Sequence, residues 1–570
     1  MRRAAATLLL AVAAQAPAAG QNVLVILADD LGVDWLGAYG LAADPPSTPH
    51  IDALAADGVT FVNAWGYPMC SPARAAVQTG RYGFRTGMGH IVDESYGLPL
   101  AEVTLPEMLD LGTGGAYAHA FFGKWHLASQ GVGGLLAPNL AGWGHFAGTS
   151  PAAGAVLEGE DYFHWTKVTD GVAEVVDAYA TTDTVDDALA WISARTAPWL
   201  CFVSPLAVHT PHHAPPAALH SVDLSGAGAP AQDPEPYFRA MVEALDAELG
   251  RLLGGVDPAT TTVVLAADNG TSGEVLSAPF PPGHGKATLF EGGLRVPLIV
   301  RGPSVAQPGA TCEALVAALD VFATVAELAQ VDLAAALPGV VLDSISLLPY
   351  LADPSLPSLR PWVFAEHFVP NGPTSGPIAP ALLAPVCQPD LGFGGPGDAA
   401  LSLCGPPLVE FSVPELAVVG VPPFAPVFTV FSTVATPVPS FGGTLVPNPI
   451  IWVVPAVADS AGEARYDLPV VGPGPVPYFV QAAALDAAQP LGVAITNALQ
   501  ANYQPWNTKA IRGPRWKLVA EALFGYHRLY DLEQDPLELI DLLADGVLEP
   551  TQQGEYDALL QALEALVAAP

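Results

Sequence analysis

The sequence predicts an α/β protein in which helices sandwich a large mixed, mostly parallel β-sheet. The chain has 570 residues, of which 51% are hydrophobic, so it can fill the core of one large domain and a smaller one. Apolar runs and helical patterns alternate from residue 22 to about residue 365. The runs that predict strands are 22–28, 199–204, 262–267, 297–301 and 362–365.

These runs are apolar throughout instead of alternating, which is typical of strands that are covered on both faces. Helical periodicity separates them, for example at 181–195 and 236–253, as expected for crossover helices in a mostly parallel sheet. In such sheets the functional site lies beyond the carboxyl ends of the strands. Polar residues that directly follow the apolar runs are therefore the first candidates for a site.

The composition and periodicity of residues 370–570 predict two further parts of the chain. Residues 370–500 are rich in Pro, Gly, Val and Phe and have almost no Lys or Arg, which indicates an insertion of short strands and loops. Residues 501–570 show strand-like alternation at 509–519 and an amphipathic helical pattern at 556–568, which indicate a small C-terminal subdomain. The expected division is thus 1–20, 21–369, 370–500 and 501–570.

Residues 1–20 are expected to be a signal peptide, since Arg2 and Arg3 precede an apolar stretch that ends in small residues. A secreted or periplasmic protein is therefore expected. The apolar stretch is too short for a permanent anchor, and no later run of about 20 uninterrupted apolar residues follows. We expect no membrane anchor.

The charge balance excludes other partners. The formal net charge is −36, and the sequence has only 20 Lys and Arg residues in total. A field of this sign repels polyanions, so neither nucleic acid nor an anionic membrane surface is an expected partner.

Five cysteines in an exported protein predict one or two disulfides with one cysteine left over. Cys70 is the candidate for the unpaired residue. Cys387 and Cys404 lie close together in the Pro/Gly-rich stretch and could close a loop, although spacing alone proves no bridge.

Two strand-like runs end in oxygen-bearing side chains. Asp29 and Asp30 follow the run 22–28, and Asp268 and Asn269 follow the run 262–267. Such pairs commonly cap a turn or a helix, but together they supply four oxygen ligands from two strand ends. Oxygen ligands suit a hard cation such as Ca²⁺ or Mg²⁺, whereas zinc calls for His or Cys.

A short helix is expected to start at Cys70, because Pro72 lies near its beginning and Gly80 at its end. Residue 70 would then lie at the positive end of the helix dipole, where an anion is stabilised. Arg74, one turn into the helix, could donate two hydrogen bonds to an oxyanion. The alternative is a structural cysteine in a disulfide.

The segment Cys70-Ser-Pro72-Ala-Arg74, followed by Thr79-Gly80-Arg81, resembles the C-x-P-x-R and T-G-R maturation signature of the sulfatase family, in the alkaline phosphatase superfamily. Further segments resemble the same arylsulfatase-like proteins in the same order along the chain. They are Ala28–Gly32, Phe122–Leu127, His209–Pro211, Ala267–Gly270 and Lys286–Pro297. Residues 511–518 and 529–538 resemble the family's small domain, which implies a smaller C-terminal antiparallel sheet with a packed helix.

The resemblance implies that a formylglycine-generating enzyme oxidises Cys70 to formylglycine during maturation. The hydrate of this aldehyde would supply the nucleophilic oxygen that attacks a sulfate ester of a sugar, an aryl alcohol or an alkyl alcohol. The resemblance also implies one Ca²⁺ ion, acting as a Lewis acid and template. Its ligands would be residue 70 itself and Asp29, Asp30, Asp268 and Asn269.

The resemblance implies roles for five further residues. Arg74 and Lys124 would hold the hydrate and its charge. His126 would remove a proton from the hydrate so that sulfate is expelled and the aldehyde returns. His209 and Lys286 would lie near the leaving-group oxygen, where one of them donates a proton or a hydrogen bond.

The sequence leaves alternatives open. A phosphate or phosphonate ester hydrolase of the same superfamily would use a similar metal and cationic clamp, and a non-catalytic protein that binds sulfated glycans belongs to another class. The run His209-Thr-Pro-His212-His213 invites a zinc site, but no partner ligands stand at a recognisable spacing. We expect His212 and His213 to be solvated or at the substrate's edge. The chain departs from the family pattern at Ala128 and Ala267, and above all in 370–500.

Overall fold

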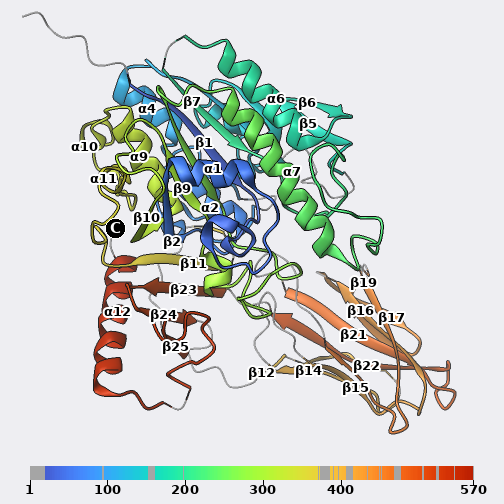
Figure 1. The fold of residues 1–570 in the computed structure, drawn as a ribbon. Coiled ribbons are helices and arrows are strands. Elements are labelled where there is room, and N and C mark those ends of the chain that lie inside the picture. The colour runs from blue at the N-terminus through green and yellow to red at the C-terminus, as the bar shows by residue number, and fades with distance from the viewer. Residues whose placement is uncertain are drawn as a thin grey trace, which may run out of the picture.

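The structure is a computed structural model that describes residues 20–568, except 93–95, 152–160, 197, 370, 373–385, 389, 396, 406–414, 433, 448–449, 451, 468–476, 503–505, 522–525 and 545. A ten-stranded sheet in the order β10-β2-β9-β8-β1-β7-β3-β4-β5-β6 forms its centre (Figure 1). Its strands are β1 (Asn22–Ala28), β2 (Val59–Trp65), β3 (Ala118–Lys124), β4 (Phe146–Thr149), β5 (Trp165–Thr169), β6 (Val172–Val176), β7 (Trp199–Ser204), β8 (Thr261–Ala267), β9 (Leu298–Arg301) and β10 (Ala310–Ala317).

The predicted mixed, mostly parallel sheet is confirmed. Strand β1 pairs in parallel with both β7 and β8, and β3 pairs in parallel with β7 and β4. Strand β9 is antiparallel to β2 and β8, and β5 is antiparallel to β4 and β6. Residues 23–28 of β1 are at most 1% exposed, as expected for a strand covered on both faces.

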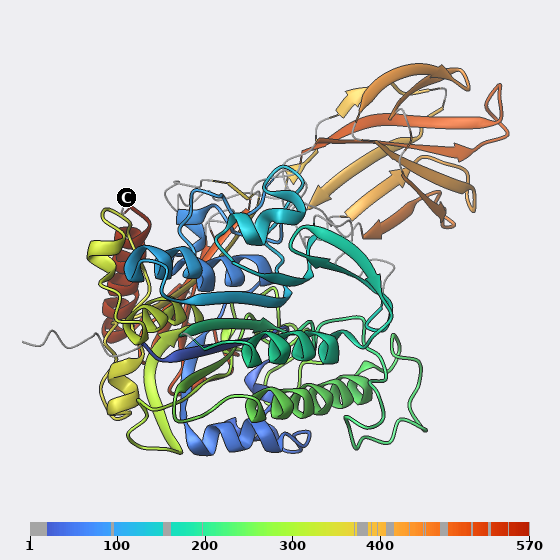
Figure 2. The ribbon, with the colours of Figure 1, turned by 90° about the horizontal axis from the view of Figure 1, so that it is seen from above.

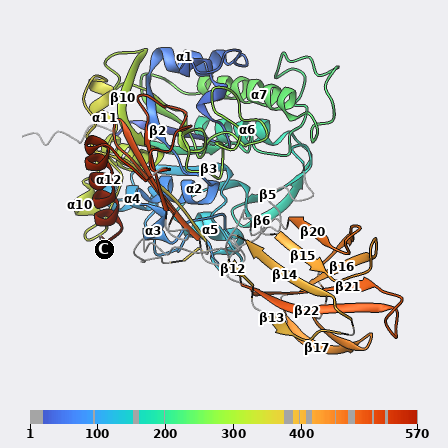
Figure 3. The same ribbon diagram turned by 90° about the horizontal axis from the view of Figure 1, so that it is seen from below.

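Helices cover both faces of this sheet. On one face, α7 (Pro234–Gly254) contacts both α1 (Pro49–Asp57) and α6 (Ala180–Ser193). Figures 2 and 3 show the second group on the opposite face. It includes α2 (Cys70–Thr79), α3 (Gly83–Thr86), α4 (Leu105–Thr113), α5 (Ala137–Leu140), α9 (Val321–Leu328) and α10 (Leu333–Ala336). Two further short helices are α8 (Glu291–Leu294) and α11 (Leu348–Ala352).

The predicted helix at Cys70 is confirmed as α2, which follows β2 and is buried along its whole length. Gly80 ends it in the left-handed conformation, with a φ of 67°, and donates its N–H to the carbonyl of Ala76. The helix therefore begins at residue 70 inside the protein.

One predicted strand lies in a different sheet. The apolar run 362–365 was expected in the main sheet, but it begins β11 (Val363–Val369), which is antiparallel to β23 (Trp506–Arg512). With β24 (Trp516–Glu521) and β25 (Tyr526–Asp531) they form a four-stranded antiparallel sheet, against which α12 (Pro550–Ala568) packs. The run is apolar because both faces of β11 are covered, by Leu518 and Leu563 on one side and by Trp65 on the other.

The stretch between β11 and β23 forms short strands and loops, as predicted, together with two longer strands. Its sheets are ordered β12-β14-β15-β20 and β13-β22-β21-β16-β19, with a β17-β18 hairpin. They have their own apolar core and extend away from the main body (Figure 2, orange). The strands are β12 (Val386–Cys387), β13 (Asp390–Gly392), β14 (Ala400–Gly405), β15 (Glu415–Val419), β16 (Pro426–Ser432), β17 (Ala435–Ser440), β18 (Gly443–Pro447), β19 (Trp452–Val457), β20 (Ala464–Asp467), β21 (Pro477–Leu485) and β22 (Val493–Asn502).

The cysteines differ in part from expectation. Cys404 is disulfide-bonded, and the register of β12 with β14 places Cys387 opposite it, in agreement with the proposed loop closure. Cys70, Cys201 and Cys312 are free thiols, so the expectation of one leftover cysteine was wrong. Cys201 lies inside the sheet on β7 and Cys312 on β10, and both are buried.

Among the helices of the described residues, none combines the length and the hydropathy that crossing a bilayer requires. The predicted signal peptide falls almost wholly on residues 1–19, outside the described part. The four-part division of the chain stays a prediction.

Gly80 is expected to matter for the stability of α2. A Cβ at this position would meet the ring of Phe322 at 2.8 Å, whereas a Cβ at Gly114, which has the same φ of 67°, would meet nothing within 4 Å. Gly114→Ala should therefore cost only the left-handed strain of about 1 kcal/mol, and Gly80→Ala should cost about 1–3 kcal/mol more through overpacking. Urea unfolding of both variants measures the difference. Equal losses would contradict the assigned packing.

Candidate active site

The ends of β1 and β8 bring four polar side chains together. Ala28 and Ala267 are paired in the parallel register, so the residues that follow them are neighbours. The backbone N–H of Asp30 donates to Asp268 Oδ1 at 3.3 Å, and Asn269 Nδ2 donates to Asp30 Oδ1 at 2.8 Å. Together with Asp29, these residues are at most 2% exposed. The expected cluster at the carboxyl ends of the strands is thus present.

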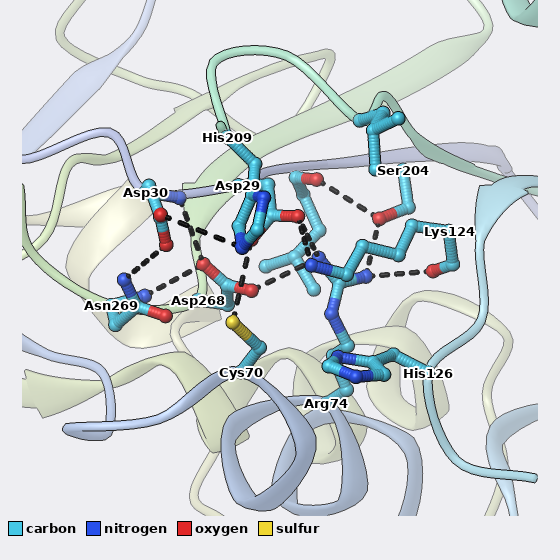
Figure 4. A network of polar contacts seen from close by, with 12 residues as sticks. Asp29, Asp30, Cys70, Arg74, Lys124, His126, Ser204, His209, Asp268 and Asn269 are labelled. Carbon is cyan, nitrogen blue, oxygen red and sulfur yellow. Dashed lines mark hydrogen bonds and ion pairs between the residues drawn. The ribbon is translucent and has the colours of Figure 1, made fainter. Parts of the chain in front are cut away.

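Cys70 lies against this cluster at the start of α2. Its Sγ is 3.6 Å from Asp29 Oδ1 (Figure 4). The side chain is 1% exposed, and burial raises the pKa of the thiol to about 12. The sulfur is therefore an uncharged thiol, free of any disulfide, beside three carboxylates.

Arg74 points from α2 into the same cluster. Its Nη2 is 2.9 Å from Asp268 Oδ2 and 3.5 Å from Asp29 Oδ2. Its Nη1 donates to the carbonyl of Lys124 at 2.7 Å and to Ser204 Oγ at 2.6 Å. The guanidinium is thereby fixed in one orientation.

Lys124 and Lys286 pair with Asp29 and Asp30, respectively. Lys124, the last residue of β3, is fully buried and its Nζ is 2.5 Å from Asp29 Oδ2. Lys286 approaches from a loop, with Nζ 2.7 Å from Asp30 Oδ1 and 2.8 Å from Oδ2. Burial would lower the pKa of Lys286, but attraction to Asp30 outweighs it and raises the pKa well above its ordinary value. Lys286 is therefore charged.

The two candidate histidines are neutral. Burial, with Lys124 and Arg74 nearby, lowers the pKa of His126 well below its usual range. His126 has a φ of 54°, and its backbone carbonyl accepts a hydrogen bond from Ser71 Oγ at 2.9 Å. Burial and Lys124 also lower the pKa of His209 to about 4, although Asp30 opposes this shift from 3.8 Å away.

The carboxylates are not equivalent. Burial raises the pKa of a carboxyl, but Lys124 and the other cations around Asp29 outweigh burial and hold its pKa well below the usual range. Lys286 does the same for Asp30. Asp268 lacks such a lysine, so burial and the charge of Asp29 raise its pKa to about 7. The three carboxyls repel one another, and a cation between them would relieve this repulsion.

The donor set fits a hard divalent cation. Asn269 Oδ1 is buried and accepts no hydrogen bond from the described residues, and a buried acceptor of this kind is costly unless something pairs with it. Ligand atoms of Asp29, Asp30, Cys70 and His209 lie within 4.8 Å of one another, the group that could hold a metal among the described residues. A thiol is a poor ligand for a hard cation, but an oxygen at the same position would be a good one.

All the candidate site residues predicted from sequence meet in this one place. The structure corrects the expectation for His212, which is 9% exposed and packs against the ring of Phe238. His213 is half-buried and packs against Tyr162, with ring centroids 4.1 Å apart and ring planes tilted by 32°. Neither belongs to the metal-ligand group found among the described residues.

Two residues of the site were missed. Ser204 Oγ accepts from Arg74 and donates to the carbonyl of Leu27 at 3.2 Å. Ser204 ends the apolar run 199–204, so the strand-end argument used for Asp29 could have found it. Tyr162 donates its hydroxyl to the carbonyl of His209 at 2.7 Å, and no pattern in the sequence indicates this contact.

The chain is similar to known proteins. The sequence profile described as Sulfatase matches residues 21–331. The chain is 33% identical to arylsulfatase A of Bos taurus over 368 residues, which cover 60% of this chain and 70% of that protein. It is 30% identical to steryl-sulfatase of Mus musculus over 441 residues, which cover 60% of this chain and 67% of that protein.

The fold also resembles solved structures. One is the structure of a protein in complex with its substrate D-glucosamine-2-N,6-O-disulfate. It matches with a TM-score of 0.57 and 16% identity, covering 96% of this chain and 97% of that chain. At this identity the likeness concerns the fold alone.

Removing Lys124 should be far more costly than removing another paired lysine. Lys124→Met leaves the fully buried carboxylate of Asp29 without its closest cation, which we expect to cost about 3 kcal/mol in the metal-free protein. Lys167→Met is the control, because its partners Asp183 and Asp187 are 19% and 32% exposed and can be hydrated. Its cost should be at most about 1 kcal/mol. Chemical denaturation in chelator measures both, and similar losses would contradict the burial of the Asp29–Lys124 pair.

Proposed function

The chain belongs to the sulfatase family and is an enzyme that hydrolyses sulfate esters, and from this premise we propose that its nucleophile is a formylglycine made from Cys70 and its metal one Ca²⁺ ion. The observation that carries the proposal is the position of Cys70. A free thiol, at the start of a buried helix, lies 3.6 Å from one of three buried carboxylates. The non-catalytic alternative is set aside by the family.

The metal ligands in this proposal are Asp29, Asp30, Asp268, Asn269 and residue 70. When bound, Ca²⁺ supplies Lewis-acid polarisation of a sulfate oxygen and a template for the reacting groups. The buried Oδ1 of Asn269 without a hydrogen-bond partner, and the raised pKa of Asp268, support this ligand set. The hydrate of formylglycine supplies a nucleophilic oxygen in place of the poorly suited thiol.

Arg74 and Lys124 provide fixed positive charge next to residue 70. Arg74 is held by Asp268, Ser204 and the carbonyl of Lys124, so it does not reorganise during the reaction. The ammonium of Lys124 has three N–H donors, of which one points to Asp29. Its other donors can stabilise negative charge on the hydrate or on the sulfate, in a site that excludes water.

Lys286 and His209 would act on the leaving group. As the S–O bond breaks, its electron pair stays on the leaving oxygen, which needs a proton or a hydrogen bond. The site's electrostatics favour Lys286 as the donor, because Asp30 keeps it charged, whereas His209 is neutral near pH 7. His126 is also neutral, as a group that takes a proton from the hydrate must be.

The substrate class stays broad in this proposal: a sulfate ester of a sugar, an aryl alcohol or an alkyl alcohol. We also propose that the protein is exported to the periplasm or the medium and meets a formylglycine-generating enzyme during maturation. Hydrolysis of a phosphonate or phosphate ester is the competing reaction. Rates on the sulfate ester and the phosphonate ester of one alcohol distinguish these two reactions.

Conversion of Cys70 is the first test. In protein made with a formylglycine-generating enzyme, the peptide that contains residue 70 should be lighter than the cysteine peptide by the difference between CH₂SH and CHO. Cys70→Ala should lower kcat/KM for sulfate esters on the order of 10⁴-fold or more, because the nucleophile is lost. Mass spectrometry and kinetics on the same preparation make the check. Full activity with unmodified Cys70 would rule out the proposed nucleophile.

Metal removal is the second test. Chelator should abolish activity and lower the Tm, and Ca²⁺ should restore both. A free Ca²⁺ concentration of about 100 times the Kd adds about 2.7 kcal/mol of stability. Asn269→Leu removes one oxygen ligand and should shrink the Ca²⁺-dependent rise in Tm. Within each variant, the Tm with Ca²⁺ is compared with the Tm without Ca²⁺, so a general loss of stability does not affect the result. An unchanged rise in Asn269→Leu would remove Asn269 from the ligand set.

A further inference from the structure

The loop that carries Lys286 is held by the C-terminal subdomain. This loop continues into the short helix α8, whose first residue is Glu291. The carboxylate of Glu291 accepts hydrogen bonds from Arg512 Nη1 at 2.6 Å and from Lys517 Nζ at 3.2 Å. Both cations belong to the small antiparallel sheet, on β23 and β24.

A second carboxylate closes this cluster. Glu538 Oε2 accepts the backbone N–H of Glu291 at 2.5 Å, and Glu538 Oε1 is 2.6 Å from Lys517 Nζ. Lys517 is fully buried, and Glu291 and Glu538 are each 4% exposed. The start of α8 is therefore fastened through both its backbone and its side chain.

The same cluster reaches the segment before Cys70. Trp65 Nε1 donates to Glu291 Oε1 at 3.1 Å, and Lys517 Nζ lies 4.9 Å from the centre of the Trp65 ring. Two residues after Trp65, the N–H of Tyr67 donates to the carbonyl of Asp268 at 3.0 Å, so this segment is bonded directly to the site. Lys517 thus contacts the segment before Cys70, through Trp65, and the segment after Lys286, through Glu291.

The loop itself has little freedom to move independently. A Cβ on Gly292 would lie 2.6 Å from the carbonyl of His284, and one on Gly293 would lie 2.5 Å from the carbonyl of Gly285. Ala287, next to Lys286, has a φ of 70° and donates its N–H to the carbonyl of Pro68 at 2.9 Å. These contacts tie residues 284–293 closely to one another, so the position of Glu291 bears on that of Lys286.

Buried ion pairs are a weak source of stability, since desolvation offsets most of their attraction. Apolar residues would fill this space at lower cost, so the cluster is better explained by the orientation it imposes. Asp268 and Asn269 follow β8, which is paired on both sides in the main sheet. A hydrogen bond from the N–H of Gly270 to the carbonyl of Gly293 at 2.9 Å joins this strand end to α8. The residue of the site that depends on it most directly is Lys286.

We infer that Lys517 is a positioning residue for the reaction: with Glu291 and Glu538 it holds loop 286–294 so that Lys286 Nζ faces the leaving-group oxygen. The inference rests on the proposed function and deepens it. When the S–O bond breaks, the electron pair remains on the leaving oxygen, and the N–H of Lys286 stabilises it. The C-terminal subdomain thereby sets how well the enzyme cleaves esters of poor leaving groups.

The test compares two esters that differ chiefly in the acidity of the leaving phenol, 4-nitrophenyl sulfate and phenyl sulfate. In Lys517→Met, kcat/KM for phenyl sulfate should fall about tenfold or more beyond any loss on 4-nitrophenyl sulfate, because the poorer leaving group needs the donor more. Lys517→Arg should recover part of the phenyl sulfate rate. All variants are assayed as full-length protein with residue 70 verified as converted.

Lys509→Met is the matched control. Lys509 is equally buried on β23 and pairs with Glu366, which holds the N–H of Phe84 instead of the Lys286 loop. Its loss should lower the Tm and should affect both esters alike. Should Lys517→Met fail to fold, Trp65→Phe carries the same comparison, because it removes the Nε1–H donor to Glu291 and keeps a smaller aromatic ring at this position.

The outcomes separate the two levels of the argument. A converted wild-type enzyme that cleaves neither ester nor any other sulfate would overturn the proposed function, and the inference with it. An active wild type whose Lys517→Met and Trp65→Phe variants lose equal activity on both esters would overturn the inference alone. A greater loss on phenyl sulfate in these variants, absent in Lys509→Met, supports it.

Discussion

The site depends on the balance between three buried carboxylates and three cations, of which Arg74 and Lys124 are buried and Lys286 is half-buried. Carboxylates at this depth cannot stay ionised without compensating charge. The cations come from a helix, a strand end and a loop, so the balance holds only when these three elements meet at the ends of β1 and β8. The groups are Asp29, Asp30 and Asp268 with Arg74, Lys124 and Lys286. This dependence couples the geometry of the site to the integrity of the main sheet.

A second buried charge cluster couples the site to the rest of the chain. Glu291 joins Arg512 and Lys517 of the small sheet to a loop of the large domain. Strand β11 adds to this junction, because Glu366 at its centre pairs with Lys509 and accepts the N–H of Phe84. The small antiparallel sheet is therefore joined to the main sheet and its loops through buried charged groups.

The β-rich insertion is built differently. Its two sheets enclose a separate apolar core. Its beginning is nevertheless tied to the surroundings of the site: Asn371 Oδ1 accepts the N–H groups of Gly89 and His90, and the N–H of Val92 donates to Ser71 Oγ. The residue next to Cys70 and the root of the insertion thus share one short segment.

The sequence by itself determined the features that depend on neighbouring residues: apolar runs covered on both faces, the polar residues that end them, and the helix bracketed by Pro72 and Gly80. The tertiary structure alone decided which elements meet. An apolar run records only that both its faces are covered, so 362–365 could not reveal that it joins the small sheet. The pairing of Glu291 with Arg512 spans 221 residues, and Tyr162 reaches His209 through a backbone carbonyl. Such contacts depend on how distant segments pack, which no local pattern encodes.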